Sequence, residues 1–69
     1  MWIRSQDGLE LLKVEGFYVS GNSVYDYLTE CILGRYKSKE KALDALDLIQ
    51  DHLNDFRNGY REVFEMPKY

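Results

Sequence analysis

The stretch SKEKALDALDLIQDHLNDFRNG, residues 38–59, decides the fold because it predicts one amphipathic helix over about residues 39–57. Ser38 is a favourable N-cap residue, and the pair Asn58-Gly59 supplies the left-handed residue that commonly ends a helix. Apolar side chains recur at spacings of three and four residues, which is the period of a single buried face. This apolar stripe comprises Ala42, Leu46, Ile49, Leu53 and Phe56, broadened by Ala45 and Leu48.

The residues before this helix predict antiparallel strands joined by short turns. Residues 1–6 suit a first strand, and Asp7-Gly8 is a pair that favours a two-residue hairpin turn. A second strand is expected over residues 9–19, with a bulge or bend at Gly16. We expect the first strand to be an integral, paired part of the sheet.

A third strand is expected over residues 24–36. The residues of this segment alternate between two faces, but thirteen residues is long for one strand. We therefore expect an interruption near Thr29-Glu30. A short helix over residues 24–31, capped by Ser23, is an alternative for the first half of the segment.

One more strand is expected after the helix. Residues 60–66 fit a strand with two faces, and Pro67 ends the pattern. One face carries Tyr60, Glu62, Phe64 and Met66, and the other carries Arg61, Val63 and Glu65. The predicted fold class is α+β, with the order β-β-β-α-β in a single domain over residues 1–69. The small sheet is antiparallel, the helix packs on one of its faces, and the last strand pairs at a sheet edge or with another chain.

Composition favours a folded protein of marginal stability. The chain has 69 residues, of which 45% are hydrophobic and 14% aromatic. A chain of this length buries only roughly 60% of the surface that its unfolded form exposes. No apolar run approaches the roughly 20 residues of a membrane helix, and the N-terminus lacks the pattern of a secretory signal. We therefore expect a cytoplasmic protein with no membrane partner.

The single cysteine and the single histidine argue against several kinds of site. Cys31 has no partner for an internal disulfide, and His52 alone does not suggest a zinc site, so no metal and no cofactor are expected. Cys31 is expected to be a small buried residue and His52 a residue on the helix flank. The sequence contains no recognisable catalytic arrangement and no phosphate-binding glycine loop, so we expect a protein that is not an enzyme. A second copy of the chain, as a homodimer or higher oligomer, is the expected source of further stability.

Four segments carry a resemblance to other proteins: MWIRSQD (1–7), ILGRY (32–36), EKALDALDLI (40–49) and YREVFEMP (60–67). Together they resemble a set of small uncharacterised proteins of Gram-positive bacteria and of their phages and mobile elements. The resemblance covers nearly the whole chain and implies a compact α+β unit without an established activity. These relatives often carry an acidic residue where this chain has Arg35, so a site that uses Arg35 is peculiar to this branch. Small phage proteins of this size with known roles are often inhibitors or sponges acting on host defence.

Basic charge is concentrated at the predicted start of the helix, although the net charge is −3. Residues 35–41 carry four basic and one acidic side chain, whereas residues 1–34 carry two basic and five acidic ones. Unpaired backbone N–H groups and the helix dipole favour an anion at a helix N-terminus. We therefore predict a phosphate site there, with a solvated lysine surface as the alternative. The predicted ligands are Arg35, Lys37, Ser38, Lys39 and Lys41.

Tyrosines complete the predicted ligand site. Tyr36 within the basic segment, with Tyr25 and Tyr27 on a nearby strand, offers ring faces for a base, and stacking contributes roughly 1–3 kcal/mol per base. Packing in the core or at an interface is the alternative for these rings. Arg4 is a further candidate ligand residue, paired with Asp7 or supplied by another subunit, and a local contact in the first turn is its alternative.

The side of the helix opposite the apolar stripe is acidic. It carries Asp44, Asp47, Asp51 and Asp55, which are too spread along the helix to share one metal ion. This face is either solvated or a docking surface. Because no broad basic face opposes it, long duplex nucleic acid is not an expected partner.

Two functions of different classes follow. The first is a homo-oligomer that sequesters an anionic, nucleotide-like signalling molecule through the basic segment and the tyrosines. The second is a protein-interaction module that docks on a host or phage protein through a tyrosine-rich sheet face or the acidic helix face.

Overall fold

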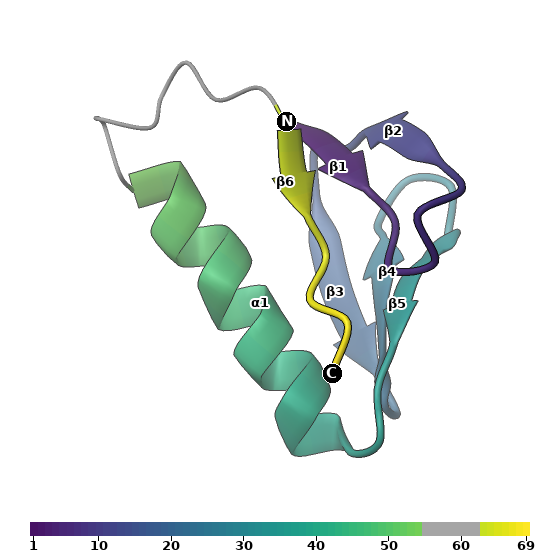
Figure 1. Ribbon diagram of the computed structural model, residues 1–69, viewed down its shortest axis with the longest axis vertical. Helices are drawn as coiled ribbons and strands as arrows, with labels where there is room; N and C mark the ends of the chain where they lie inside the picture. The colour runs from purple at the N-terminus through teal and green to yellow at the C-terminus, as the bar shows by residue number, and fades with distance from the viewer. Residues whose placement is uncertain (55–62) are drawn as a thin grey trace.

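The computed structural model describes residues 1–54 and 63–69, and these residues form six strands and one helix (Figure 1). The elements are β1 (Trp2–Arg4), β2 (Leu11–Lys13), β3 (Phe17–Ser20), β4 (Ser23–Asp26), β5 (Ile32–Arg35), α1 (Lys39–Asn54) and β6 (Val63–Glu65). The predicted α+β class is confirmed, with strands before the helix and one strand after it. In place of the single predicted sheet there are two, ordered β2-β1-β6 and β3-β4-β5.

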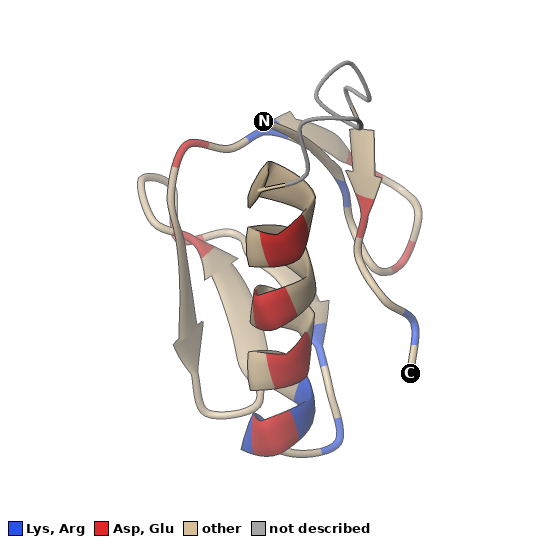
Figure 2. Cartoon of the chain, turned by 90° about the vertical axis from the view of Figure 1, so that its left-hand side faces the viewer, with Lys and Arg blue, Asp and Glu red and all other residues tan. Residues whose placement is uncertain are grey.

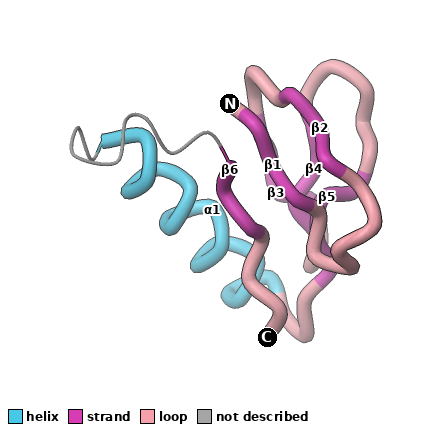
Figure 3. Tube along the Cα trace, turned by 45° about the horizontal axis from the view of Figure 1, so that its top comes forward, coloured by secondary structure: helices cyan, strands magenta, loops and turns pink. Residues whose placement is uncertain are grey.

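In the first sheet, β1 is the central strand. It pairs with β2 in antiparallel fashion, and β6 runs parallel to it on the other side, so that Ile3 lies opposite both Leu12 and Phe64. In Figures 1 and 3, β6 lies between α1 and β1. The prediction that the last strand pairs at a sheet edge is thus confirmed for residues 63–65, and the rest of the predicted strand, residues 60–62, lies outside the described residues.

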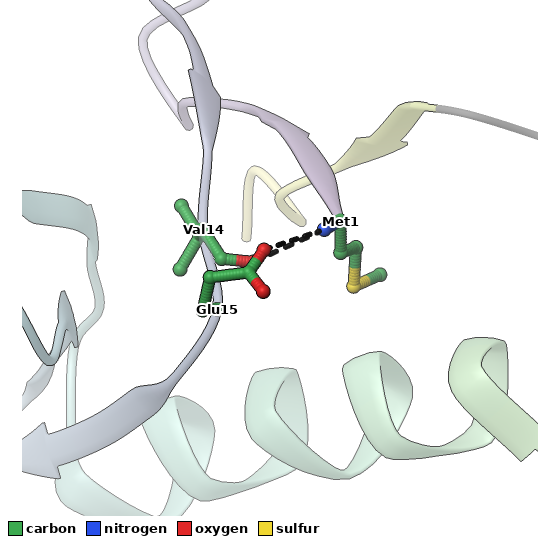
Figure 4. A network of polar contacts seen from close by, with 3 residues as sticks. All are labelled: Met1, Val14 and Glu15. Carbon is green, nitrogen blue, oxygen red and sulfur yellow. Dashed lines mark hydrogen bonds and ion pairs between the residues drawn. The ribbon is translucent and has the colours of Figure 1, made fainter.

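The N-terminal end of β1 is bonded to the backbone that follows β2. The amino group of Met1 donates a hydrogen bond to the carbonyl of Val14 at 3.2 Å and lies 3.6 Å from the Glu15 carboxylate (Figure 4). The N–H group of Val14 donates in return to the Met1 carbonyl at 2.8 Å. The expectation that the first strand is a paired part of a sheet is therefore confirmed.

The prediction of a two-residue turn between the first two strands is wrong, because the connection between β1 and β2 is longer. Arg4 pairs with Leu11, so six residues, 5–10, form the loop. The Oγ atom of Ser5 accepts a hydrogen bond from Glu10 N at 3.1 Å, and the Asp7 carboxylate accepts one from Leu9 N at 2.9 Å. These side chains bind backbone donors inside the loop and so stabilise a wider turn than Asp7-Gly8 alone would form. Gly8 still has the positive φ, +78°, that the pair predicts.

The predicted strand over residues 9–19 is divided between the two sheets, with β2 in one and β3 in the other. The division falls at Val14–Gly16, which agrees with the bend expected at Gly16. The carbonyl of Gly16 accepts a hydrogen bond from Tyr27 N at 2.9 Å. A Cβ atom at Gly16 would lie 3.2 Å from Tyr27 Cβ, so the backbone approach here favours glycine.

The interruption expected near Thr29-Glu30 is confirmed, because residues 27–31 separate β4 from β5. The Asp26 carboxylate accepts hydrogen bonds from Leu28 N at 3.0 Å and from Thr29 Oγ1 at 2.9 Å, and Glu30 has a φ of 62°. These features form a tight turn between antiparallel strands. The alternative of a short helix over residues 24–31 is therefore wrong.

Helix α1 begins where the sequence predicts. Ser38 Oγ accepts a hydrogen bond from Lys41 N at 3.2 Å, which is the geometry of an N-cap. The helix continues to Asn54, and the predicted end over residues 55–59 lies outside the described residues.

Three of the seven residues of the predicted stripe on α1 lie in the core, Leu46 is half-buried, and Phe56 lies outside the described residues. Ala42, Ala45 and Ile49 are buried, and the helix packs against β3 and β4. The assignments of Leu48 and Leu53 to the buried face are wrong, since these side chains are 42% and 57% exposed. Leu48 is rotated about 100° from Ile49 around the helix axis, and Leu53 lies in the last described turn.

The core lies where the helix and both sheets meet. It draws on β1, β4, β5 and α1 and on residues beside the strands, which explains why no single sheet face accounts for it. Its buried members are Ile3, Val14, Val24, Leu33, Tyr36, Ala42, Ala45, Ile49 and Met66.

Candidate functional site

Four of the five predicted phosphate ligands lie at the N-terminal end of α1, whereas Arg35 is the last residue of β5. Lys37, Lys39 and Lys41 are exposed, and Ser38 is half-buried as the helix cap. Figure 2 shows these basic residues at one end of the helix, with the acidic residues spread along it. Because the positive end of the helix dipole adds to the lysine charges, this basic end is the most favourable place for an anion on α1.

Tyr36 does not present a ring face to a ligand. Its side chain is only 4% exposed, and its hydroxyl group donates a hydrogen bond to the Pro67 carbonyl at 3.0 Å. Burial, together with the nearby Tyr69, raises the pKa of Tyr36 to about 12. Gly34 makes this burial possible, because a Cβ atom there would lie 2.6 Å from the Tyr36 hydroxyl oxygen. The stacking role predicted for Tyr36 is therefore wrong, and the core alternative describes this residue.

An aromatic ring that the sequence did not suggest lies at the basic end instead. Tyr69 is 48% exposed, and its ring centroid lies 5.8 Å from the ring centroid of Tyr36. The Nζ atom of Lys41 lies 5.2 Å from the ring centroid of Tyr69. The last distance is within the range of a cation–π contact. No local sequence signal links Tyr69 to the helix start; only the burial of Tyr36 against the segment after β6 places it there.

Arg35 borders a shallow cavity of about 150 Å³. The cavity lies between β5 and the loop that joins β1 to β2, and it is lined by residues 5–7 and 32–35. Two hydrogen bonds hold its walls together: Gln6 N donates to the Leu33 carbonyl, and Arg35 N donates to Gln6 Oε1, each at 2.8 Å. Arg35 thus lies between the cavity and the segment that leads into α1.

Arg4 is placed away from the role predicted for it. Its Nη1 atom donates a hydrogen bond to the Gly8 carbonyl at 3.3 Å, and within residues 1–54 and 63–69 it forms no ion pair with Asp7. Asp7 instead accepts a hydrogen bond from Ser5 Oγ at 2.6 Å. The hydrogen bond from Ser5 is the largest cause of a pKa of Asp7 that lies below its usual value, and the hydrogen bond from Leu9 N is the second largest. The alternative of a local contact in the first turn therefore describes Arg4.

Tyr25 and Tyr27 contact a third tyrosine on the β3-β4-β5 sheet. The rings of Tyr18 and Tyr25 stack at 5.0 Å with an interplanar angle of 10°, and Tyr27 lies edge-on to Tyr18 at 6.3 Å. Tyr18 was missed as a candidate, although its pairing with Tyr25 across two antiparallel strands brings the rings together. Tyr27 is 66% exposed. The structure therefore assembles a tyrosine cluster, Tyr18, Tyr25 and Tyr27, around Tyr18 rather than around the basic end.

The remaining titratable candidates lie on α1 and beside the β4–β5 turn. Asp44, Asp47 and Asp51 are exposed along α1, and Asp55 lies outside the described residues. His52 packs edge-on against Phe64 at 5.3 Å, on the flank of the helix as expected. Cys31 is exposed beside the β4–β5 turn, so the expectation that it is buried is wrong.

Among residues 1–54 and 63–69, no group of three or more His, Cys, Asp or Glu side chains could hold a metal ion. The described helix is also too short and too polar to cross a membrane.

Comparison with protein-family models, with curated proteins and with solved structures gave no match.

Proposed function

We propose that this chain is a small non-enzymatic protein that binds an anionic, nucleotide-like molecule at the basic end of α1. The observation that carries the proposal is the position of Lys41, whose Nζ atom lies 5.2 Å from the exposed Tyr69 ring beside the capped helix start. A cationic group, free helix N–H groups and an aromatic ring face are the three features that a phosphorylated base requires.

Charge supports an anion over a neutral ligand. Lysines at a helix N-terminus oppose the helix dipole, each at a cost of about 0.3–1 kcal/mol when well placed. A bound phosphate is attracted both to Lys37, Lys39 and Lys41 and to the positive end of the dipole, and this attraction offsets that cost. Tyr69 takes the stacking role for which Tyr36 is too deeply buried.

The biological role proposed for such a binder is sequestration. As a homo-oligomer, the protein removes a nucleotide-like signal from solution, which is the action of an anti-defence sponge encoded by a phage or mobile element. This part of the proposal draws on the resemblance to small mobile-element proteins, and it places the protein in the host cytoplasm.

A second function is favoured by a different observation, the tyrosine cluster. Tyr27 is 66% exposed, and the neighbouring Leu28 is 71% exposed, so the cluster borders an apolar surface outside the core. Tyrosine is enriched in protein interfaces because it combines a large apolar ring with a polar hydroxyl group. Under this alternative the protein docks on a host or phage protein through this surface or through the acidic face of α1.

Native mass spectrometry with a mixture of mononucleotides and cyclic dinucleotides tests the first function. The wild-type protein is expected to retain a discrete added mass. The double variant Lys37→Gln/Lys39→Gln, which removes two positive charges at the basic end, is expected to lose it. The matched control is Gln50→Glu/Asn54→Asp, which changes the net charge equally on exposed residues at the far end of α1.

The outcomes separate the two functions. An added mass that is retained by Lys37→Gln/Lys39→Gln, or lost equally in the control, contradicts the assignment to the basic end. If no nucleotide binds the wild-type protein, the second function is tested by a pull-down from host extract. Its matched pair of baits is wild type and Tyr27→Ser, and it predicts a partner that the variant does not capture.

A further inference from the structure

The outer face of the β2-β1-β6 sheet, the face turned away from the core, carries six exposed side chains in a regular array. Strand register places them in two rows across the three strands. The first row is Lys13, Trp2 and Val63, and the second row is Leu11, Arg4 and Glu65. Neighbouring strands lie about 4.8 Å apart, and rows two residues apart are separated by about 6.8 Å, so the array is compact.

Three of the six side chains on the outer face are apolar: Trp2 on the central strand, and Leu11 and Val63 at diagonally opposite corners. Trp2 is 41% exposed, Leu11 is 49% exposed and Val63 is 42% exposed. The opposite face of the same strands carries Ile3, which is fully buried, and Leu12 and Phe64, which pack against the core. A sheet in a small domain usually turns polar side chains to water on its outer side. The apolar residues here therefore indicate a face that is covered.

The charges on the outer face are arranged so that the face complements itself. Lys13 stands at one corner of the array and Glu65 at the diagonally opposite corner, while Leu11 and Val63 occupy the other two corners. Within the described residues neither Lys13 nor Glu65 has an ion-pair partner. A twofold axis along the Leu11–Val63 diagonal brings each charged corner to within about 4 Å, measured along the sheet, of the oppositely charged corner of the other copy. Each lysine side chain is therefore within reach of the glutamate of the other copy.

We propose that the outer face is the interface of a homodimer with this twofold axis. In it, Lys13 of each copy pairs with Glu65 of the other, while Leu11 and Val63 each meet their own counterparts. Arg4 lies next to Trp2 of the other copy, where a guanidinium group can interact with the indole ring. The strands of the two sheets cross at a near-right angle, which is one of the two usual arrangements of packed sheets.

Because the axis is twofold, the interface is isologous: both copies use the same surface, and every contact between two different residues occurs twice. This inference rests on the homo-oligomer named in the proposed function and assigns its interface. Its test uses no ligand, so failure of the dimer and failure of nucleotide binding are observed separately.

Sedimentation equilibrium of charge-reversal variants tests the interface. Lys13→Glu places two glutamates opposite each other at both contacts, and Glu65→Lys places two lysines there. Each variant alone is expected to weaken the dimer at least about tenfold. An equimolar mixture of the two is expected to restore it to within about threefold of wild type. In the mixed dimer, one chain carries glutamate at both positions and the other carries lysine at both, so both contacts become attractive.

The matched controls are Lys37→Glu and Asp47→Lys, which make the same charge changes on exposed residues away from the outer face. These variants are expected to dimerise as wild type does, alone or mixed. All four altered residues are exposed, and thermal unfolding monitors the fold of each variant. A wild-type protein that stays monomeric up to about 100 µM overturns the proposal. A dimer that the Lys13 and Glu65 variants leave unchanged, or that their mixture does not restore, overturns it as well.

Discussion

The hydroxyl group of Tyr36 donates a hydrogen bond to the backbone carbonyl of Pro67 at 3.0 Å, joining two residues that are 31 positions apart in the sequence. This bond ties the segment after β6 to the residue that follows β5. It also brings Tyr69 within 5.8 Å of the Tyr36 ring and next to Lys41. The position of Tyr69 in the proposed ligand site therefore depends on a buried hydrogen bond between two residues that do not themselves touch the ligand.

Replacement of Tyr36 by phenylalanine is expected to lower the free energy of unfolding by about 0.5–1.5 kcal/mol, because the Pro67 carbonyl loses its donor. Urea denaturation followed by circular dichroism measures the change. Tyr27→Phe is the matched control, since that hydroxyl belongs to a side chain that is 66% exposed, and its effect is expected to stay within about 0.5 kcal/mol. Equal effects of the two variants would contradict the structural role of the Tyr36 bond.

The stability that Tyr36 provides is expected to depend on pH. Its pKa is about 12 in the folded protein and about 10 when the chain is unfolded, so above pH 10 the unfolded chain releases the proton first. The contribution is therefore complete below pH 10 and is lost as the pH rises towards 12. Urea denaturation at pH 9 and pH 11 is expected to show that the advantage of wild type over Tyr36→Phe falls by about 1 kcal/mol. An advantage that is constant or grows over this interval contradicts the burial of the phenol.

The sequence predicted those features that depend on neighbouring residues. The cap at Ser38 and the buried positions Ala42 and Ile49 follow from helix periodicity, and the interruption near Thr29-Glu30 follows from the length of the segment. Each of these is a local property of the chain, so no knowledge of the rest of the fold was needed.

The features that the sequence did not predict depend on distant pairing. The division of residues 9–19 between two sheets arises because β2 pairs with β1, whereas β3 pairs with β4. The burial of Tyr36 requires both the bare backbone at Gly34 and the carbonyl of Pro67. Tyrosines are frequent on sheet faces and in strands, so composition alone does not distinguish Tyr36 from Tyr69.

Gly34→Ala is expected to destabilise the protein by about 1–3 kcal/mol, because the new Cβ atom would lie 2.6 Å from the Tyr36 hydroxyl oxygen and 2.9 Å from its Cζ atom. The ring cannot move away freely while its hydroxyl group binds Pro67. In a Tyr36→Phe background the closest atom is absent, so the cost of the same substitution is expected to fall. A double-mutant cycle of unfolding free energies measures this coupling, and strictly additive effects would show that the contact does not constrain Gly34.

Ser5→Ala is expected to raise the pKa of Asp7 towards its usual value, because the hydroxyl group of Ser5 is the first cause of the lowered pKa. A carboxyl group whose pKa is lowered by folding contributes stability above about pH 3.8, and that contribution is lost as the pH falls through the folded value. NMR titration of the Asp7 carboxyl carbon measures the shift directly. Ser20→Ala is the matched control, because Ser20 is an exposed serine outside this loop and is expected to leave the Asp7 titration unchanged. If Ser5→Ala leaves the titration unchanged as well, the 2.6 Å hydrogen bond between Ser5 and Asp7 does not hold the loop in solution.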